Sequence, residues 1–300
     1  MNVRDGNILD GSTVFEPGLV KATARGKTHP VDNLFHSQKF WEFIYVDSGF
    51  ALLGGMGNSV LMTAGDFAVV APGETHSLVA PPDAVVFCCL FMDYELGNMR
   101  DEIFSLPGFI DLSARAKLAL EGKAIPKNVR FECTRLDFSE RQELVRICEG
   151  IMRERLSKVR GWQQIVKSLL CQLLVFYSRL DVSTKRSERT PDGVQNSCLK
   201  IIRFLEDNFK SNITGADIAE HIGLSVDYMM KQFRAEFDIS PADYLRRYRI
   251  AKSMELLCGT DIPINDVAES CGFVDFSAYS RVFKNLVGET PSAFRKRFLR

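Results

Sequence analysis

The feature that most constrains this chain is a repeat within its last hundred residues. Residues 225–234 and 275–284 align at an offset of fifty, and each stretch begins with a residue type that caps helices. Each also contains an aromatic residue followed by a basic one, and after each stretch come a hydroxyl residue with a proline and then a second aromatic residue. The matching pairs are Phe233 and Phe283, Pro241 and Pro291, and Tyr244 and Phe294. Two copies of one helical unit are therefore predicted between residues 197 and 300.

A tight corner between two helices is predicted just before each copy. Ala219 stands four residues before Gly223, and Ala268 stands four residues before Gly272. A small alanine lets two helices approach closely, and glycine readily takes the left-handed backbone conformation that such a corner requires. The first residue of each copy would then cap the following helix. This is the pattern of a helix-turn-helix unit, whose second helix lies in a DNA major groove.

With these motifs in place, residues 197–300 closely resemble the DNA-binding domain of the AraC/XylS family of bacterial transcription regulators. The second copy, residues 267–295, is close to the signature of that family. The resemblance implies two helix-turn-helix units, at about 214–237 and 263–287, joined by a long helix at about 242–257. A helix of that length spans roughly 25 Å. It would hold the second helices of the two units, which we call the reading helices, about one DNA turn, roughly 34 Å, apart.

Helical spacing sorts the side chains of the two reading helices. Met229 and Phe233 are four residues apart, as are Tyr279 and Phe283, so these four are predicted to face the core. The opposite face is predicted to contact DNA. The candidate DNA-contacting residues are Asp227, Met230, Lys231, Arg234, Ser277, Ser280, Arg281 and Lys284.

These candidates are expected to have different roles. The guanidinium of Arg281 can bond guanine O6 and N7 together, and Lys231 is its counterpart in the first copy. Arg234 and Lys284, one turn further on, are expected on phosphates. An acid at Asp227 can accept a hydrogen bond from cytosine N4. The alternative interpretation is that these are solvated charges on surface helices.

Charge is balanced over the whole chain, with 38 Lys and Arg against 38 Asp and Glu. From residue 195 onward the basic residues barely outnumber the acidic ones, although Arg246, Arg247, Arg249 and Lys252 cluster on the linking helix. A protein that coats polyanions through a global positive field is therefore disfavoured, as is a purely architectural DNA binder. The DNA-binding surface is expected to be local.

The N-terminal part has a different texture, with short apolar stretches separated by turn residues over residues 12–110. This pattern predicts an antiparallel sandwich or barrel. Residues 65–76 resemble the second motif of cupin barrels, and residues 36–49 resemble the first. The fold expected is α+β multidomain, with an N-terminal cupin-like β-barrel and helical dimerisation segment, and a C-terminal all-α double helix-turn-helix domain.

The cupin resemblance implies a candidate binding site. In metal-binding cupins the matching positions would make His36, Glu42 and His76 metal ligands, but Gln38 replaces the second histidine of the first motif. Three such ligands can still form a facial metal site. The favoured alternative is a metal-free polar patch without a cofactor, beside aromatic residues that would wall a small organic ligand. The candidate ligand-binding residues are His36, Gln38, Trp41, Glu42 and His76.

Four segments are predicted along the chain. They are the barrel at 1–138, a helical segment at 139–180 that packs on the barrel or forms a dimer, a linker at 181–196, and the DNA-binding domain at 197–300. Ser139 is expected to cap the first helix of the second segment, because Gln142 follows three residues on. The linker is polar and contains a proline and a glycine near its end.

The function expected is a sequence-specific DNA-binding transcription regulator of the AraC type, controlled by a small organic effector. Its expected partners are double-stranded DNA, a second copy of the chain and RNA polymerase. The competing hypothesis is a metal-dependent cupin enzyme, a dioxygenase or isomerase, with a DNA-binding tail. The apolar runs are short and no leader is visible, so a cytoplasmic location without a membrane is expected. The eight scattered cysteines are expected to be reduced hydrophobic residues, with a thiol redox sensor as the alternative.

Overall fold

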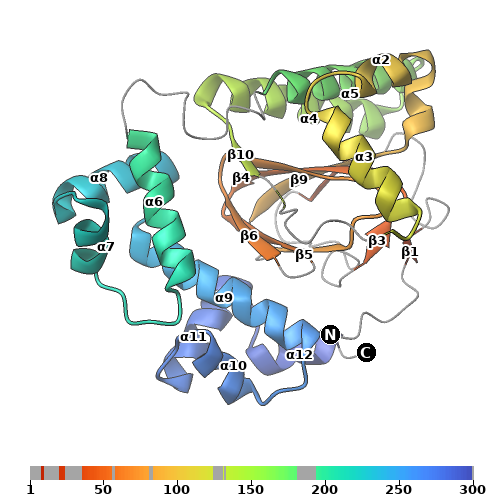
Figure 1. Ribbon diagram of the computed structural model, residues 1–300. Helices are drawn as coiled ribbons and strands as arrows, with labels where there is room; N and C mark the ends of the chain where they lie inside the picture. Colours follow the sequence, from red (N-terminus) through yellow and green to blue (C-terminus); the bar gives the residue numbers. More distant parts are fainter. Residues whose placement is uncertain are drawn as a thin grey trace. The chain divides into compact units, whose positions relative to one another are not determined.

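The chain divides into two compact units (Figure 1). The computed structural model describes residues 8–9, 20–23, 36–55, 58–80, 84–123, 131, 133–180 and 194–298. The first unit takes in nearly all of residues 2–183 and contains all the described strands, whereas the second begins at Thr184 and is helical. This arrangement confirms the predicted α+β multidomain fold. Most of the predicted linker at 181–196 lies outside the described residues, so the domain boundaries stay predictions.

Two antiparallel sheets form the N-terminal unit. A five-stranded sheet has the order β10-β7-β4-β9-β2, a three-stranded sheet has the order β6-β5-β8, and β1 pairs with β3 in parallel. The strands are β1 (Ile8–Leu9), β2 (Val20–Thr23), β3 (Ser37–Gln38), β4 (Trp41–Ser48), β5 (Phe50–Gly55), β6 (Asn58–Thr63), β7 (Asp66–Val70), β8 (His76–Val79), β9 (Val85–Phe91) and β10 (Cys133–Arg135).

Strand β4 has both faces buried, from Trp41 to Val46. Its odd-numbered residues, such as Phe43, join the hydrophobic core beneath the helices. Successive side chains of a strand point to opposite faces, so Glu42 lies on the other side. There it meets His76 of the three-stranded sheet, which places Glu42 between the two sheets.

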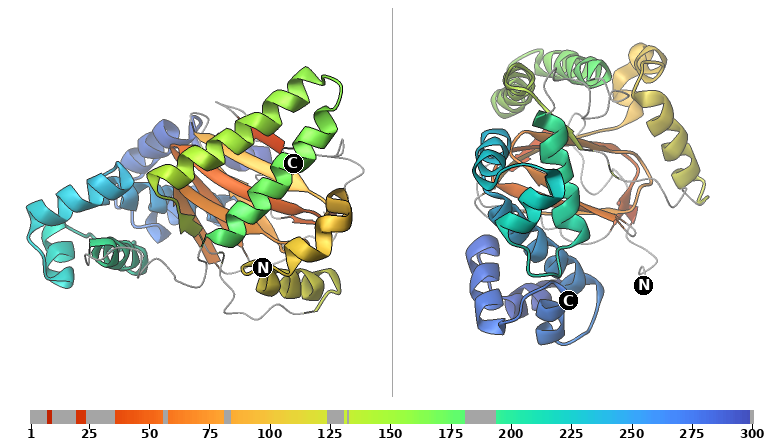
Figure 2. Two further views of the ribbon diagram at one scale, coloured as in Figure 1. Left: turned by 90° about the horizontal axis from the view of Figure 1, so that it is seen from above. Right: turned by 60° about the vertical axis from the view of Figure 1, so that its left-hand side comes forward.

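Helices cover the outer face of the five-stranded sheet. They are η1 (Asp93–Met99), α2 (Arg100–Phe104), α3 (Phe109–Leu120), α4 (Phe138–Ser157) and α5 (Trp162–Arg179). Helices α4 and α5 lie side by side across the sheet (Figure 2), and Leu144, Ile147, Leu170 and Leu173 bury their inner faces in one core with the strands. No described helix of the chain is both long enough and apolar enough to cross a membrane.

The predicted cap of helix α4 is wrong by two residues. Asp137 is the N-cap, because its carboxylate accepts a hydrogen bond from the Glu140 N–H at 2.8 Å. The Glu140 carboxylate in turn accepts from the Asp137 N–H at 2.8 Å, which completes a capping box. Ser139 lies inside the first turn. The pair Asp137 and Glu140 has the same spacing as Ser139 and Gln142, so two capping patterns competed, and the charged pair is the one formed.

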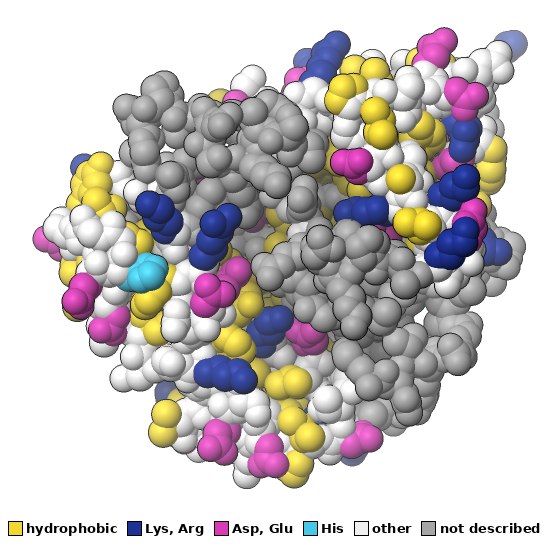
Figure 3. All heavy atoms as spheres, in the orientation of Figure 1, with side chains coloured by type: hydrophobic (Ala, Val, Ile, Leu, Met, Phe, Trp, Pro, Cys, Tyr) yellow, Lys and Arg dark blue, Asp and Glu magenta, His cyan; other side chains and the backbone are white. Residues whose placement is uncertain are grey.

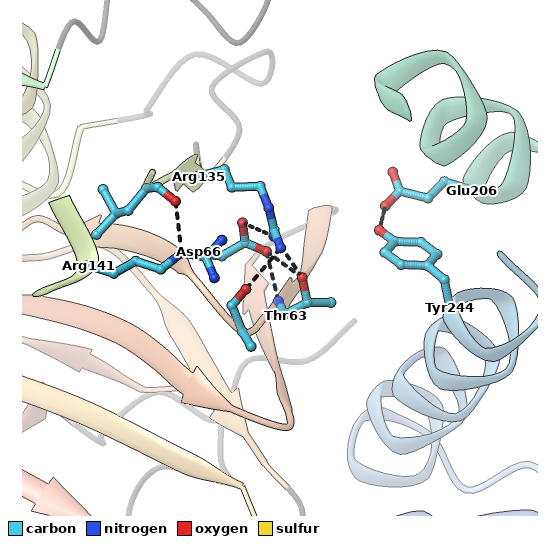
Figure 4. Close-up of polar contacts among 8 residues, drawn as sticks. Thr63, Asp66, Arg135, Arg141, Glu206 and Tyr244 are labelled. Atoms are coloured by element: carbon cyan, nitrogen blue, oxygen red, sulfur yellow. Dashed lines mark hydrogen bonds and ion pairs between the residues drawn. The ribbon is translucent and has the colours of Figure 1, made fainter. Parts of the chain in front are cut away.

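A buried ion pair ties β10 to the turn between β6 and β7 (Figure 4). Arg135 donates to Asp66 Oδ1 at 3.0 Å, to Thr63 Oγ1 at 3.0 Å and to the Ala64 carbonyl at 3.0 Å. Asp66 also accepts from the Thr63 N–H at 2.8 Å. Both charged side chains are almost fully buried, at 6% and 3% exposure. The network holds in place the strand that leads directly into α4.

The C-terminal unit consists of seven described helices. They are α6 (Val194–Asp207), α7 (Gly215–Ile222), α8 (Val226–Phe237), α9 (Pro241–Gly259), α10 (Ile264–Ser270), α11 (Phe276–Val287) and α12 (Pro291–Phe298). Helices α7 and α8 form one helix-turn-helix unit, and α10 and α11 form the other. Helix α9 joins them and has 19 residues, or roughly 28 Å.

All eight cysteines are thiols, and all except Cys258 are buried. Burial raises the pKa of Cys148 and of Cys271 to about 12, so the reactive thiolate form is suppressed at both. This environment favours the expected role of cysteine as a small hydrophobic residue.

Replacing Asp66 with Ala is expected to lower the free energy of unfolding of the N-terminal unit by about 3–5 kcal/mol, because Arg135 would become an unpaired buried charge. Both tryptophans, Trp41 and Trp162, lie in this unit, so their fluorescence during urea titration follows its unfolding alone. The control Asp101→Ala removes an exposed carboxylate and should cost less than about 1 kcal/mol. Equal losses in the two variants would contradict the structural role of the buried pair.

Candidate nucleic-acid interface and buried polar cluster

The two reading helices, α8 and α11, bury the same positions. The four residues predicted to face the core are all 0% exposed: Met229, Phe233, Tyr279 and Phe283. The repeat continues into the next helix. Phe233 packs edge-on against Tyr244 with 5.9 Å between ring centroids. Phe283 packs edge-on against Phe294 at 5.4 Å. The same aromatic contact therefore fixes the rotation of both reading helices.

The predicted glycine corners are confirmed. Gly223 and Gly272 have φ values of 71° and 81°, in the left-handed region. In both copies the residue after the glycine donates its N–H to the carbonyl of the predicted alanine, Ala219 or Ala268, at 3.0 Å. The second corner has one extra residue, Val274, which is fully exposed.

The predicted caps at the start of both reading helices are also confirmed. Ser225 Oγ accepts a hydrogen bond from the Tyr228 N–H at 3.4 Å. Asp275 accepts from the N–H groups of Ser277 and Ala278, at 2.9 and 3.1 Å. The N-terminal end of each helix, where base contacts concentrate in helix-turn-helix proteins, is thereby fixed.

The candidate DNA-contacting residues lie away from the buried stripe. Six of them are exposed, namely Asp227, Lys231, Arg234, Ser277, Arg281 and Lys284, while Met230 and Ser280 are half-buried at its edge. Lys231 and Arg281 occupy equivalent positions in the two copies. The structure therefore groups each set on one side of its helix, and contact with DNA stays a prediction.

The basic residues of α9 do not form one free cationic stripe. Arg246 pairs with Asp243 at 2.6 Å, and Lys252 pairs with Glu255 at 3.1 Å. Arg249 donates to backbone carbonyls instead. On the face of the helical unit that Figure 3 shows, Lys and Arg side chains are interspersed with Asp and Glu. The local character expected of the basic surface agrees with these pairings.

Between the two sheets, four of the five predicted ligand-binding residues come together. Glu42 Oε2 accepts from Gln38 Nε2 at 3.0 Å and from His76 Nε2 at 3.1 Å. His36 and His76 exchange backbone hydrogen bonds at 2.9 Å, and their ring centroids are 4.5 Å apart. All four side chains belong to residues that are at most 5% exposed. We call these residues the buried polar cluster.

Both ring nitrogens of His76 face hydrogen-bond acceptors, so both carry a proton. Nε2 meets the Glu42 carboxylate, and Nδ1 lies 3.1 Å from the Glu74 carbonyl. Burial by itself would lower the pKa of His76, but the hydrogen bond and the charge of Glu42 outweigh burial and raise it. Burial would likewise raise the pKa of Glu42, but His76 lowers it below the usual range. The two residues form a buried ion pair.

These residues do not fit the metal site of the cupin resemblance. A doubly protonated imidazole at His76 has no lone pair to offer a metal ion. Oxygen Oε2 of Glu42 already accepts two hydrogen bonds. Within the described residues, no group of three His, Cys, Asp or Glu side chains is arranged to hold a metal.

Trp41 does not lie with the other four predicted residues. It occupies the opposite face of β4 from Glu42, where its Nε1 donates to Asp93 Oδ1 at 2.6 Å. Its ring stacks on Phe104 at 5.1 Å. The prediction that Trp41 lies with the other four residues is wrong because neighbouring residues in a strand point to opposite faces. Trp41 directly precedes Glu42, so the two side chains lie on different sides of the sheet.

The comparisons with known proteins agree with this geometry. A family described as a helix-turn-helix domain matches residues 218–297, from α7 to α12. The HTH-type transcriptional activator RhaR of Yersinia pestis bv. Antiqua (strain Angola) is 27% identical over 267 residues, which cover 88% of this chain and 85% of that protein. The chain is therefore a DNA-binding transcription regulator that is similar to regulators of the AraC type.

Two further known proteins are each similar to about one third of this chain. The Msm operon regulatory protein of Streptococcus mutans serotype c is 33% identical over 97 residues, or 32% of this chain and 35% of that protein. A solved structure of a regulator with an AraC-type DNA-binding domain, from Chromobacterium violaceum, aligns with 36% of this chain and 96% of its own at 23% identity and a TM-score of 0.34.

Sequence reasoning missed two residues of this AraC-type regulator that position the sites. Glu74 is a buried carboxylate that accepts from the Ala71 N–H at 2.9 Å and pairs with Arg115 of α3 at 3.1 Å. It thereby anchors the turn that carries His76. Arg249 belongs to the basic cluster of the linking helix in the sequence, but its guanidinium bonds backbone carbonyls. No pattern in the sequence predicts either role, because Glu74 pairs with a distant helix and Arg249 bonds backbone carbonyls.

The stability of the N-terminal unit of this regulator is expected to depend on pH through His76. A raised pKa means that the contribution of His76 is complete below its unfolded value of about 6.5 and is lost as the pH rises through the folded value. The urea midpoint followed by tryptophan fluorescence should therefore fall as the pH rises from about 6.5 into the alkaline range. His76→Gln should remove this dependence and His221→Gln, in the other unit, should retain it. A wild-type midpoint that stays constant over this range would contradict the ion pair.

Proposed function

We propose that this AraC-type regulator reads two successive major grooves of DNA with each monomer, through α8 and α11, and that a small organic effector bound in the N-terminal unit controls this reading. The observation that carries the DNA half of the proposal is the duplicated geometry. Both helices bury the same two core positions and present a cation, Lys231 or Arg281, at the same outward position.

The roles of the outward residues follow from their chemistry. Arg281 bonds a guanine through two N–H groups, and Lys231 contacts a base in the neighbouring groove. Arg234 and Lys284, one turn further along each helix, bind phosphates and set the register. Helix α9 separates the two units by a length comparable to one DNA turn, so the two half-sites are centred about 10–10.5 base pairs apart.

The effector site is proposed at the buried polar cluster. His76 and Gln38 supply hydrogen-bond donors there, and Glu42 supplies an acceptor. A small molecule with hydroxyl or carboxylate groups would replace the bonds that these side chains now make with one another. Such a ligand controls DNA binding only if it binds two conformations of the regulator with different affinities.

A homodimer is proposed through the hairpin of α4 and α5. Its tip carries large apolar side chains that are exposed, with Leu156 at 84%, Val159 at 65% and Ile165 at 47%. A second copy would cover them and pair two DNA-binding units on a symmetric operator. A regulator of this kind acts in the cytoplasm, and RNA polymerase is its further partner when it activates transcription.

Arg281→Ala is expected to weaken binding to an operator selected by the wild type by about 1–3 kcal/mol and to relax preference at one base pair. Lys284→Ala is the matched control on the same helix. It should weaken binding to all sequences alike and reduce the salt dependence by about one phosphate contact. Selection from a randomised operator library measures both effects. An unchanged base preference in Arg281→Ala would overturn its assignment as a base reader.

A compound that binds the buried polar cluster is expected to stabilise the N-terminal unit by about 2.7 kcal/mol at a hundredfold excess over its Kd. A thermal-shift screen of polyols and small organic acids would find it, and operator titration would then measure its effect. His76→Ala should abolish the shift, while Trp41→Phe, on the opposite face of β4, should retain it. A compound that binds tightly yet leaves operator affinity unchanged would contradict effector control.

A further inference from the structure

The corner of the second helix-turn-helix unit touches, backbone to backbone, the loop that leads into the first unit. A Cβ atom placed on Gly272, in the corner of the second unit, would lie 2.7 Å from the Phe209 carbonyl oxygen and 2.9 Å from the Lys210 Cα. Residues 208–213 form the loop that leads into α7 of the first unit. The contact is thus a close approach between two main chains, for which glycine is required at position 272 beyond its corner conformation.

Arg249 joins the same two segments to the linking helix α9. Its Nε donates to the Phe209 carbonyl at 2.7 Å, and its Nη2 donates to the Ser211 carbonyl at 2.6 Å. The guanidinium also lies over the ring of Phe273, 5.8 Å from the centroid. One half-buried side chain therefore contacts the loop of the first unit and the corner of the second.

Both sides of this junction continue into the reading helices. The ring of Phe273 lies 5.2 Å from that of Tyr279, a buried residue of α11. On the other side, the loop ends at Thr214, whose side chain accepts from the Asp217 N–H and caps α7, the helix that precedes α8. Phe209 also packs edge-on against Tyr248 of α9 at 5.5 Å.

A linking helix alone fixes the distance between two units but only weakly fixes their relative rotation, since each unit can pivot about its end of the helix. A third contact between the units removes that freedom. Arginine suits this position because its planar fork offers two N–H directions and a stacking face at once, which lysine does not.

We propose that Arg249, together with Gly272, is a positioning residue that sets the rotation of α11 relative to α8 and thereby makes the regulator select operators by the spacing of their two half-sites. This inference rests on the proposed reading of two grooves by one monomer. Neither residue contacts DNA in this mechanism. Arg249 acts through the loop carbonyls, and Gly272 acts through the room it leaves for the loop.

The test uses the full chain and an operator selected by the wild type from a randomised library. One base pair is inserted or removed between the half-sites, and affinities are measured for wild type, Arg249→Lys and the control Arg246→Lys, an exposed residue of the same helix. Wild type and control should lose about a hundredfold on respacing, because the two units can no longer engage together. Arg249→Lys should bind the original operator more weakly and lose far less on respacing.

Three further measurements make the outcome decisive. Circular dichroism melting shows whether Arg249→Lys is folded, and Gly272→Ala, which pushes the loop away, provides a second variant with the same expected change in spacing preference. Affinity for a single half-site should be unchanged in folded variants. If either folded variant keeps the wild-type ratio between spacings, the positioning role is wrong. If the wild type itself protects only one half-site, the proposed two-groove reading fails instead.

Discussion

The burial of one aromatic side chain at the same position of two helices is the interaction on which the DNA-binding unit depends. Phe233 and Phe283 are fully buried, and each packs edge-on against an aromatic residue of the following helix. Once the apolar stripe of a helix is buried, its rotation is fixed, and the opposite side faces solvent. The outward position of Lys231 and Arg281 is therefore a consequence of core packing.

Because the chain has balanced charge, its recognition of DNA depends strongly on how the two reading helices are positioned. Phosphate attraction scales with the number of unpaired cations, and several basic residues of α9 are occupied within the protein. Affinity then depends on presenting two small reading faces together. Arg249 is an example, since its Nε and Nη2 bond the carbonyls of one loop and its guanidinium lies over the ring of Phe273.

Two buried ion pairs of the N-terminal unit have different consequences. The pair of Arg135 and Asp66 holds β10 beside β7. The pair of His76 and Glu42 contains a histidine, whose charge depends on pH and on its surroundings. It also lies between the sheets, where a ligand would replace its hydrogen bonds. The first pair suits a permanent structural role, and the second suits a site that changes when it binds.

The local structure of the DNA-binding unit could be predicted from the spacing of residues in the sequence. The glycine corners, the caps at Ser225 and Asp275, and the buried stripes all follow from neighbours within a few residues, so their spacing was sufficient. Three-dimensional packing was needed to show which face of β4 meets His76, and that Arg249 links a loop forty residues earlier in the chain to the second corner. A strand with both faces buried carries no polar alternation to read, and a hydrogen bond to a distant carbonyl leaves no pattern, because every residue has one.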